Sequence, residues 1–184
     1  MVSAEVIAKL PDKLKPVTDE QNGNAAVVLL LKARRDDFDL LLVKRVENPS
    51  DTWSGQMAFP GGKREPKDPS LKDTVMRETL EEIGVALTNC QFLGVLGAVR
   101  SEPKPDFKIL PFVVILKGKP KLKLNKAELE TYTWVPYEKV LQSNNTVQFS
   151  FGEIPAYVFK KGIVWGITYN ILSEFIEAVE NAQK

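Results

Sequence analysis

Apolar residues in the first third of the chain fall into two runs, 25–33 and 38–46, separated by a short polar turn. Both are rich in Val and Leu and are bounded by turn-forming residues, which is typical of buried strands. Together they predict a β-hairpin. Further runs predict strands at 91–99, 109–116, 131–135, 148–151 and 157–164, an exposed edge strand with alternating Lys at 119–124 and a loop at 100–107.

Helical spacing of apolar residues predicts a long helix over 165–182 near the end of the chain. Shorter helices are predicted at 3–10, with Ser3 as the N-cap, and at 137–141. The long helix places on one face Ile167, Ile171, Leu172, Phe175, Ile176 and Val179. Segment 1–24 otherwise contains prolines and a polar turn, so we expect it to be peripheral.

One further helix, over 69–83, carries the densest candidate chemistry. Asp68 is a suitable N-cap, Pro69 suits the first helical position, and Gly84 can end the helix in a left-handed conformation. At about 100° per residue, one side of this helix is acidic and the other is apolar. The acidic side carries Glu78, Glu81 and Glu82, and the apolar side Leu71, Val75, Met76, Leu80 and Ile83.

The three glutamates lack a basic residue four positions after any of them, although like charges at that spacing destabilise a helix. A solvated helix face is one explanation. A divalent cation bound by the carboxylates is the other, and Mg²⁺ prefers oxygen ligands together with substrate phosphates.

The order of elements predicts the α/β class, with a mixed sheet between helices, as one domain over 1–184. The 184 residues are 43% hydrophobic and 27% charged, which is ordinary for a globular domain. A net charge of +1 favours neither nucleic acid nor an anionic membrane as a partner. The absence of histidine excludes His-based catalysis, and the apolar runs are too short to span a bilayer, so we expect a cytoplasmic protein.

The stretch 59–85 resembles the Nudix box, whose second half here reads Arg77-Glu78-Thr79-Leu80-Glu81-Glu82-Ile83-Gly84-Val85. Thr79 stands where the family has an aliphatic residue. Fourteen residues separate Gly62 from Arg77 where the common pattern has thirteen, so either Glu65 or Asp68 fills the first acidic position. The resemblance implies a Nudix-type α/β/α sandwich and a Mg²⁺-dependent or Mn²⁺-dependent diphosphatase of a nucleoside diphosphate derivative.

The same resemblance implies roles for individual residues. The metal ligands would be Glu78 and Glu82, with Glu81 and the Gly62 carbonyl as further ligands, and Arg77 would hold the carboxylates by an ion pair. Because the chain has no histidine, the proton acceptor would be a carboxylate, with Glu78 and Glu102 as candidates, or a metal-bound hydroxide. Residues that could meet the substrate phosphates are Arg45, Lys63, Arg64, Arg100 and Lys104, and those that could stack a nucleobase are Trp53, Phe59 and Phe107.

Flanking segments are similar to the coenzyme A diphosphatase branch of the family. They are WSGQMAFPGGK, LPFVV, ELETYTWVP and IVWGITYNIL. This similarity implies coenzyme A or an acyl derivative as substrate, although an arginine that this branch often has downstream of Arg45 is not evident. The alternatives are hydrolysis of ADP-ribose, dinucleotides or nucleotides, an isoprenoid diphosphate isomerase, for which Cys90 is badly placed, and a silent binding module. A homodimer is left open.

Overall fold

The computed structural model describes residues 4–17, 23–35, 37–49, 54–101, 104–118 and 120–184. The elements in chain order are α1 (Ala4–Lys9), η1 (Leu10–Lys13), β1 (Ala25–Ala33), β2 (Phe38–Arg45), β3 (Met57–Ala58), β4 (Gly61–Lys63), α2 (Leu71–Ile83), η2 (Leu87–Asn89), β5 (Gln91–Val95), β6 (Val99–Ser101), β7 (Lys104–Ile115), β8 (Leu129–Pro136), α3 (Tyr137–Leu141), β9 (Asn144–Phe149), β10 (Gly152–Phe159), β11 (Gly162–Val164) and α4 (Gly166–Gln183).

The main sheet is mixed and runs in the order β3-β2-β1-β7-β5. Strand β1 lies at its centre, antiparallel to β2 and parallel to β7, so the predicted hairpin is present. Strands β4, β6 and β8 pair with β1, β7 and β2 respectively. A central strand that is covered on both faces reads as a continuous apolar run, as β1 does.

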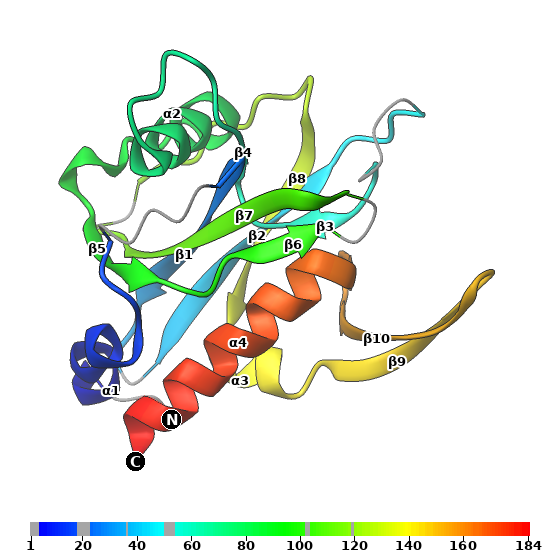
Figure 1. Ribbon diagram of the computed structural model, residues 1–184. Helices are drawn as coiled ribbons and strands as arrows, with labels where there is room; N and C mark the ends of the chain where they lie inside the picture. Colours follow the sequence, from blue (N-terminus) through cyan, green and yellow to red (C-terminus); the bar gives the residue numbers. More distant parts are fainter. Residues whose placement is uncertain (1–3, 18–22, 36, 50–53, 102–103, 119) are drawn as a thin grey trace.

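Helices cover both faces of this sheet, α2 on one side and α4 on the other (Figure 1). Alternate residues of β1 face the two layers, as strand geometry requires. Val28 and Leu30 belong to the cluster that contains α2, whereas Leu29 and Leu31 belong to the cluster that contains α4. The predicted α/β class with a mixed sheet between helices is confirmed.

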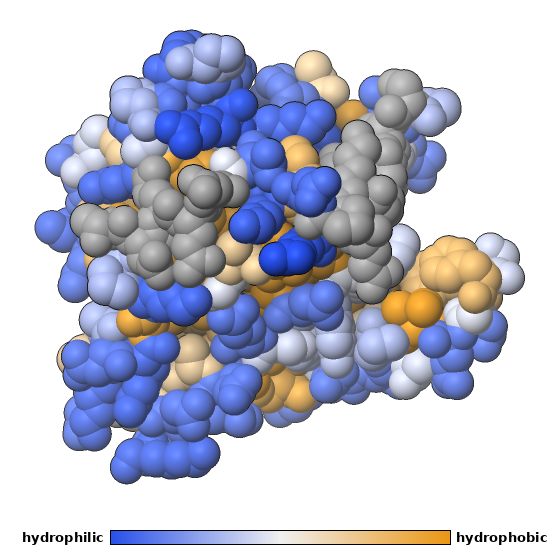
Figure 2. All heavy atoms as spheres, in the orientation of Figure 1, coloured by the Kyte–Doolittle hydropathy of each residue, from blue (hydrophilic) through white to orange (hydrophobic). Residues whose placement is uncertain are grey.

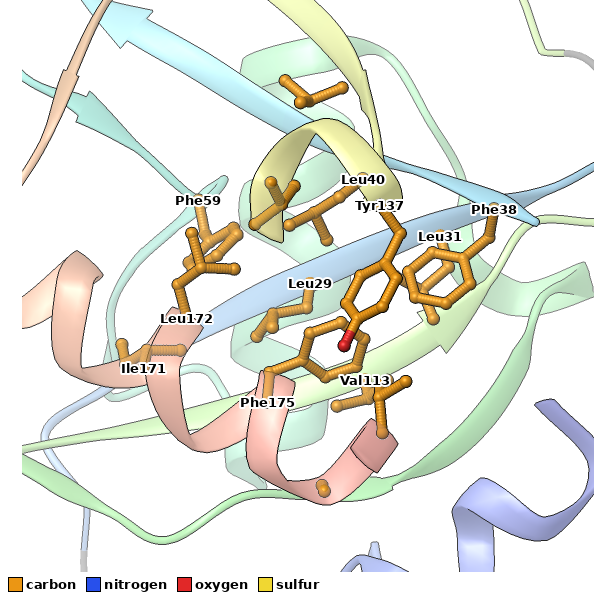
Figure 3. Close-up of a cluster of buried hydrophobic side chains, with 14 of the residues drawn as sticks. Leu29, Leu31, Phe38, Leu40, Phe59, Val113, Tyr137, Ile171, Leu172 and Phe175 are labelled. Carbon is orange, nitrogen blue, oxygen red and sulfur yellow. The ribbon is translucent and has the colours of Figure 1, made fainter. Parts of the chain in front are cut away.

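The layer beneath α4 is centred on aromatic side chains from three elements. Phe38 of β2, Tyr137 of α3 and Phe175 of α4 point toward one another (Figure 3), with ring centroids 4.8 Å apart for Phe38 and Tyr137 and 5.9 Å for Phe38 and Phe175. The helix predicted at 137–141 is present as α3 with the same bounds. The closing helix is confirmed too, and buries Ile171, Leu172, Phe175 and Val179.

The described part of the N-terminal segment is not peripheral, which corrects the prediction for 1–24. Leu10 is 1% exposed and packs in the cluster that contains α4, together with Val6. Lys15 forms an isolated β-bridge with Val95 of β5. The predicted helix at 3–10 is present as α1 and η1, and its predicted cap, Ser3, lies outside the described residues.

Three predicted strand boundaries are wrong. The strand predicted at 91–99 is divided into β5 and β6, and residues 96–98 belong to neither, although the Leu96 N–H still donates to the Pro111 carbonyl of β7. The loop predicted at 100–107 is instead largely strand, since β6 pairs with an extended β7. The edge strand predicted at 119–124 is not formed by residues 120–124, where the Lys123 N–H donates to the Ile83 carbonyl at the end of α2.

A second sheet, in the order β11-β10-β9, follows α3, and its β9–β10 hairpin projects from the body of the molecule (Figure 1). The strands predicted at 148–151 and 157–164 lie in this sheet with different bounds. Residues 150–151 form the turn between β9 and β10, and a second turn at 160–161 divides the strand predicted at 157–164 into the end of β10 and β11. Among the described residues, no helix is long and apolar enough to cross a membrane.

Candidate active site

Helix α2 begins two residues later than predicted. Ser70 is the N-cap, and its hydroxyl oxygen accepts a hydrogen bond from the Asp73 N–H at 3.1 Å. Pro69 is therefore not the first helical residue, and the Asp68 side chain is free for another role. Gly84 ends the helix in the left-handed conformation, with φ of 71°, as predicted.

Asp68 is a buried anchor for Arg77. Its carboxylate, in a residue 6% exposed, accepts hydrogen bonds from Arg77 Nε at 3.0 Å and Nη2 at 2.9 Å, and from Thr74 Oγ1 at 3.0 Å. The Arg77 guanidinium holds the pKa of Asp68 well below its ordinary value. Glu65 lies 3.5 Å from Arg77 and is exposed, so Asp68 rather than Glu65 is the principal acidic partner of Arg77.

Arg77 also contacts two of the three helix glutamates. Its Nη1 lies 2.8 Å from Glu78 Oε1 and 3.0 Å from Glu81 Oε2, and its Nη2 donates to the Lys63 carbonyl at 3.0 Å. The predicted ion pair of Arg77 is present. Arg77 lies one position before Glu78 and four before Glu81, so it pairs with residues that follow it along the helix.

Glu82 is the most deeply buried acidic side chain of the helix, with 2% of the residue exposed. Its Oε2 accepts a hydrogen bond from the Gly61 N–H at 2.9 Å. Burial raises the pKa of Glu82 to about 8, opposed by the Gly61 hydrogen bond and by the charge of Arg45, with the charge of Glu78 adding to the increase. Among the described residues, the charge of Arg45 and the Gly61 hydrogen bond therefore offset only part of the cost of burying the Glu82 carboxylate.

Two glycines bring the turn before α2 against this helix. A Cβ on Gly61, whose φ is 143°, would lie 2.2 Å from the Ala26 carbonyl oxygen. A Cβ on Gly62 would lie 2.6 Å from the carboxyl carbon of Glu78. Gly61 therefore leaves no room for a side chain beside the β1 backbone, whereas at Gly62 only the end of the Glu78 side chain would have to move.

The acidic face opens into a cavity of about 370 Å³. Its charged side contains Arg45, Lys63, Glu78, Glu82 and Glu128, beside Gly61 and Gly62. Its remaining wall is mainly apolar and comes from several elements: Ala25, Val27, Gln56, Ala58, Phe59, Phe107, Ile109, Ile167, Thr168 and Ile171. Burial raises the pKa of Glu78, opposed by Arg77. The cavity thus joins carboxylates, cations and an apolar wall.

The predicted site residues divide into those that line this cavity and those that do not. Glu78, Glu82, Gly62, Arg45 and Lys63 line it. The aromatic candidates Phe59 and Phe107 line it as well.

Glu81 and Arg100 do not line the cavity. Glu81 is directed to Arg77, and Arg100 is exposed on β6. Arg64 donates to the Asp68 and Pro69 carbonyls, and Cys90 is absent from the lining. Trp53, Glu102 and the side chain of Lys104 lie outside the described residues.

Glu128 is a site residue that sequence reasoning missed. Its carboxylate accepts from Asn125 Nδ2 at 2.8 Å, and the Asn125 N–H donates to the Glu82 carbonyl at 2.8 Å. The charge of Glu128 contributes to the raised pKa of both Glu78 and Glu82. Local spacing carries no signal for it, because 45 residues separate Glu128 from Glu82 and only the tertiary fold joins them.

A second departure from expectation concerns the apolar side of α2. Leu80 is 53% exposed, whereas Thr79 is buried and donates its hydroxyl to the Val75 carbonyl at 2.6 Å. The helix therefore packs on β1 through Leu71, Val75 and Ile83 rather than through Leu80. The internal hydrogen bond explains how a threonine is accommodated at this buried position.

The chain matches the NUDIX domain family model over residues 21–155, which includes the whole acidic helix and the cavity walls that precede α4. The chain belongs to the Nudix family. It is 28% identical over 178 residues to the uncharacterized Nudix hydrolase NudL of Photorhabdus laumondii, an alignment that covers 94% of this chain and 92% of the relative. The family model and these hydrolase relatives identify the Nudix chain as a pyrophosphohydrolase.

Solved Nudix structures share the fold. The Mycobacterium smegmatis Nudix hydrolase RenU superposes with a TM-score of 0.60 at 14% identity, covering 88% of this chain and 86% of RenU. The NUDIX domain of Shewanella oneidensis NrtR, solved with ADP ribose, superposes with a TM-score of 0.55 at 18% identity and covers all of both chains. These similarities support the α/β/α sandwich.

Proposed function

We propose that this Nudix enzyme hydrolyses the diphosphate linkage of coenzyme A or an acyl derivative, with a divalent cation such as Mg²⁺ or Mn²⁺. The products would be adenosine 3′,5′-bisphosphate and a 4′-phosphopantetheine species. The observation that carries the proposal is the composition of the cavity, in which Glu78 and Glu82 face an apolar wall that includes Phe107 and Ile167. An uncharged, flexible arm joined to a diphosphate matches both parts.

The available donors fit a hard divalent cation. The carboxylates of Glu78, Glu82 and Glu128 border one cavity together with Gly62, whose carbonyl would be a further ligand. Glu81 would have to leave Arg77 to join them. In the part of the chain that the structure describes, no group of three or more acidic side chains is already arranged as a metal site, since Arg77 holds Glu78 and Glu81. When bound, the cation would neutralise phosphate charge and lower the pKa of water.

Several side chains of the chain itself would act on the diphosphate. Arg45 and Lys63 line the charged side of the cavity, where they would meet phosphate oxygens. Glu78 has a raised pKa and would accept the proton of the attacking water. Arg77, fixed by Asp68, would position Glu78 rather than contact the substrate.

Other Nudix substrates are the main alternative, since the family acts on nucleotide derivatives and the NrtR domain was solved with ADP ribose. An isoprenoid diphosphate isomerase would need a cysteine in the site, and Cys90 does not line the cavity. A silent binding module would be expected to lose the acidic residues, which are all present.

A substrate panel tests the proposal. The protein would be incubated with Mg²⁺ and coenzyme A, acetyl coenzyme A, ADP-ribose, NADH, FAD, dinucleoside polyphosphates or nucleoside triphosphates, and the products separated by chromatography. We expect preferential release of adenosine 3′,5′-bisphosphate from the coenzyme A species. Efficient turnover of ADP-ribose with none of any coenzyme A species would contradict the substrate assignment and leave the family assignment intact.

A further inference from the structure

A second pocket adjoins the catalytic cavity. Among the described residues, its lining comes from 47–49 and 54–56 between β2 and β3, from Phe149, and from Gly162, Ile163 and Trp165 in β11 and just before α4. Gln56 lines both pockets. Trp165 immediately precedes the first turn of α4, where Ile167 and Thr168 form part of the catalytic cavity wall. The two pockets are therefore neighbours.

Three aromatic rings meet at this second pocket. The ring centroids of Phe149 and Phe151 are 5.2 Å apart with planes at 14°, and those of Phe149 and Trp165 are 5.2 Å apart with planes at 43°. Phe151 is 65% exposed, and none of the three rings belongs to the buried core clusters. Phe149 and Phe151 lie at the turn of the projecting β9–β10 hairpin, and Figure 2 shows a hydrophobic surface at the end of this hairpin.

The polar groups around these rings suit a flat heterocycle rather than a phosphate. Asn48 and Gln56 supply amide groups, which both donate and accept hydrogen bonds, and Glu47 supplies a carboxylate that accepts from an exocyclic amine. The described residues of the lining include no lysine or arginine. A base would thus be recognised in the second pocket, whereas Arg45 and Lys63 line the catalytic cavity.

We propose that this pocket binds the nucleobase of the substrate, an amino-substituted purine that stacks on Phe149 and Trp165 while the diphosphate lies beside Glu78 and Glu82. The inference rests on the proposed function, because it takes the substrate to be a nucleoside diphosphate derivative. Aromatic side chains stack bases with an energy that corresponds to a roughly 5-fold to 100-fold change in affinity on their removal. The apolar wall near Ile167 then remains available for the rest of the substrate.

An interface between two copies of the chain is the competing use of these rings. The pocket favours a small ligand for two reasons: polar side chains are part of its lining beside the rings, and Gln56 belongs both to its lining and to that of the catalytic cavity. A flat apolar patch would carry neither feature.

The test uses tryptophan fluorescence of the full chain in EDTA, so that binding is measured without turnover. AMP is the base-containing probe and ribose 5-phosphate is the base-free control. We expect AMP to quench saturably and ribose 5-phosphate to have little effect, because base stacking on Trp165 quenches the indole. Trp165→Phe should remove most of the quench, and Phe149→Leu should weaken AMP binding about tenfold.

Trp134→Phe is the matched control, because Trp134 lies in another pocket, under the Lys32 ammonium at 4.5 Å, and its loss should leave the AMP quench intact. Equal AMP affinity in Phe149→Leu and wild type, or no saturable quench, would overturn the inference. So would a dimer that Phe151→Ser converts to a monomer without any AMP quench, since the rings would then form an interface.

Failure of this inference is distinguishable from failure of the proposed function. Turnover of coenzyme A without an AMP quench would contradict base binding at the second pocket and leave the substrate assignment intact. An AMP quench without turnover of any coenzyme A species would contradict coenzyme A as the substrate and support base binding at the second pocket. In an active enzyme, Phe149→Leu should raise KM for coenzyme A more than it lowers kcat.

Discussion

Glu82 combines burial, a single described hydrogen bond from the Gly61 N–H and a pKa raised to about 8, which makes it the most informative single residue of the site. Around it, Asp68 and Arg77 form a fixed ion pair, whereas Glu78 and Glu128 border the cavity. The ion pair of Asp68 and Arg77 has a structural role at the N-terminal end of α2. Glu78 and Glu128 are positioned for chemistry, and substitutions in the two pairs should therefore have different consequences.

Glu82→Gln should separate function from stability. The amide resembles the neutral form that burial favours, and its oxygen can still accept from the Gly61 N–H, so the unfolding free energy in EDTA should not fall. Turnover should fall by roughly 100-fold or more, because a group that stabilises charge in the transition state is lost. Thermal unfolding, Mg²⁺ titration and turnover on one preparation check this, with the exposed Glu138→Gln as control. A large loss of apo stability with near-normal turnover would show that the acidic face is scaffold.

Glu128→Gln should lower kcat by about 10-fold to 100-fold with little change in stability, as for outer ligands of a metal site. The amide oxygen can keep the hydrogen bond from Asn125 Nδ2, but the negative charge beside Glu78 and Glu82 is removed. Glu130→Gln is the matched control, because Glu130 pairs at the surface with Lys44 at 2.6 Å. Equal kinetics for the two variants would exclude Glu128 from the site.

Asp68→Asn should destabilise the protein at pH 7 by about 3 kcal/mol, because Arg77 loses a buried charged partner. The pKa of Asp68 is lowered in the folded state, so the unfolded state binds more protons and stability rises with pH through this group. Its contribution is present above the ordinary value near 3.8 and is lost as the pH falls below it. Urea denaturation between pH 3 and pH 7 should show that the difference in unfolding free energy between variant and wild type becomes smaller in acid. The control is Glu65→Gln, and a difference independent of pH would contradict the argument.

At the scale of elements, the site depends on how closely β4 approaches α2. The turn of Gly61 and Gly62 lies between the β1 backbone and the Glu78 carboxylate, so the two glycines face different neighbours. Gly61 faces rigid backbone. Gly62 faces the end of a flexible side chain, which can move at little cost to folding.

Gly62→Ala should therefore fold with near-normal stability and lose most of its turnover, because the new methyl group displaces the Glu78 carboxylate. Gly61→Ala should lower the unfolding free energy by about 2 kcal/mol or more, through a backbone clash and a left-handed φ. Gly118→Ala, with φ of 82° and no atom within 4 Å of the added Cβ, measures the conformational penalty alone. Thermal unfolding and turnover are compared across the three variants. Normal turnover in Gly62→Ala would contradict the placement of Glu78 in the active site.

At the scale of the whole molecule, α2 and α4 cover opposite faces of one sheet, and the catalytic cavity is walled by both helices. The N-terminal segment adds to this arrangement. Leu10 packs in the layer that contains α4, far along the chain from the helix it supports.

Leu10→Ala should cost about 3 kcal/mol of stability, the usual range for a buried leucine, because a cavity replaces the side chain beneath α4. Leu10 does not line the catalytic cavity, so turnover at low temperature should stay near that of the wild type. Leu80→Ala removes the same group from a side chain in a residue 53% exposed and should change stability by less than about 0.5 kcal/mol. Equal stability losses for the two variants would show that the N-terminal segment is dispensable for the core.

The sequence by itself determined those features whose signal is local or periodic. The apolar runs of β1 and β2, the 3.6-residue pattern of α4, the left-handed end of α2 at Gly84 and the acidic face of that helix all follow from neighbouring residues. The tertiary structure alone decided contacts between distant segments. It assigned Asp68 rather than Glu65 to Arg77, turned Leu80 outward and Thr79 inward, divided the strand predicted at 91–99, and brought Glu128 to the cavity. These outcomes depend on which surfaces meet when the sheet closes between its helices, because burial and charge pairing are properties of the assembled chain, not of local spacing.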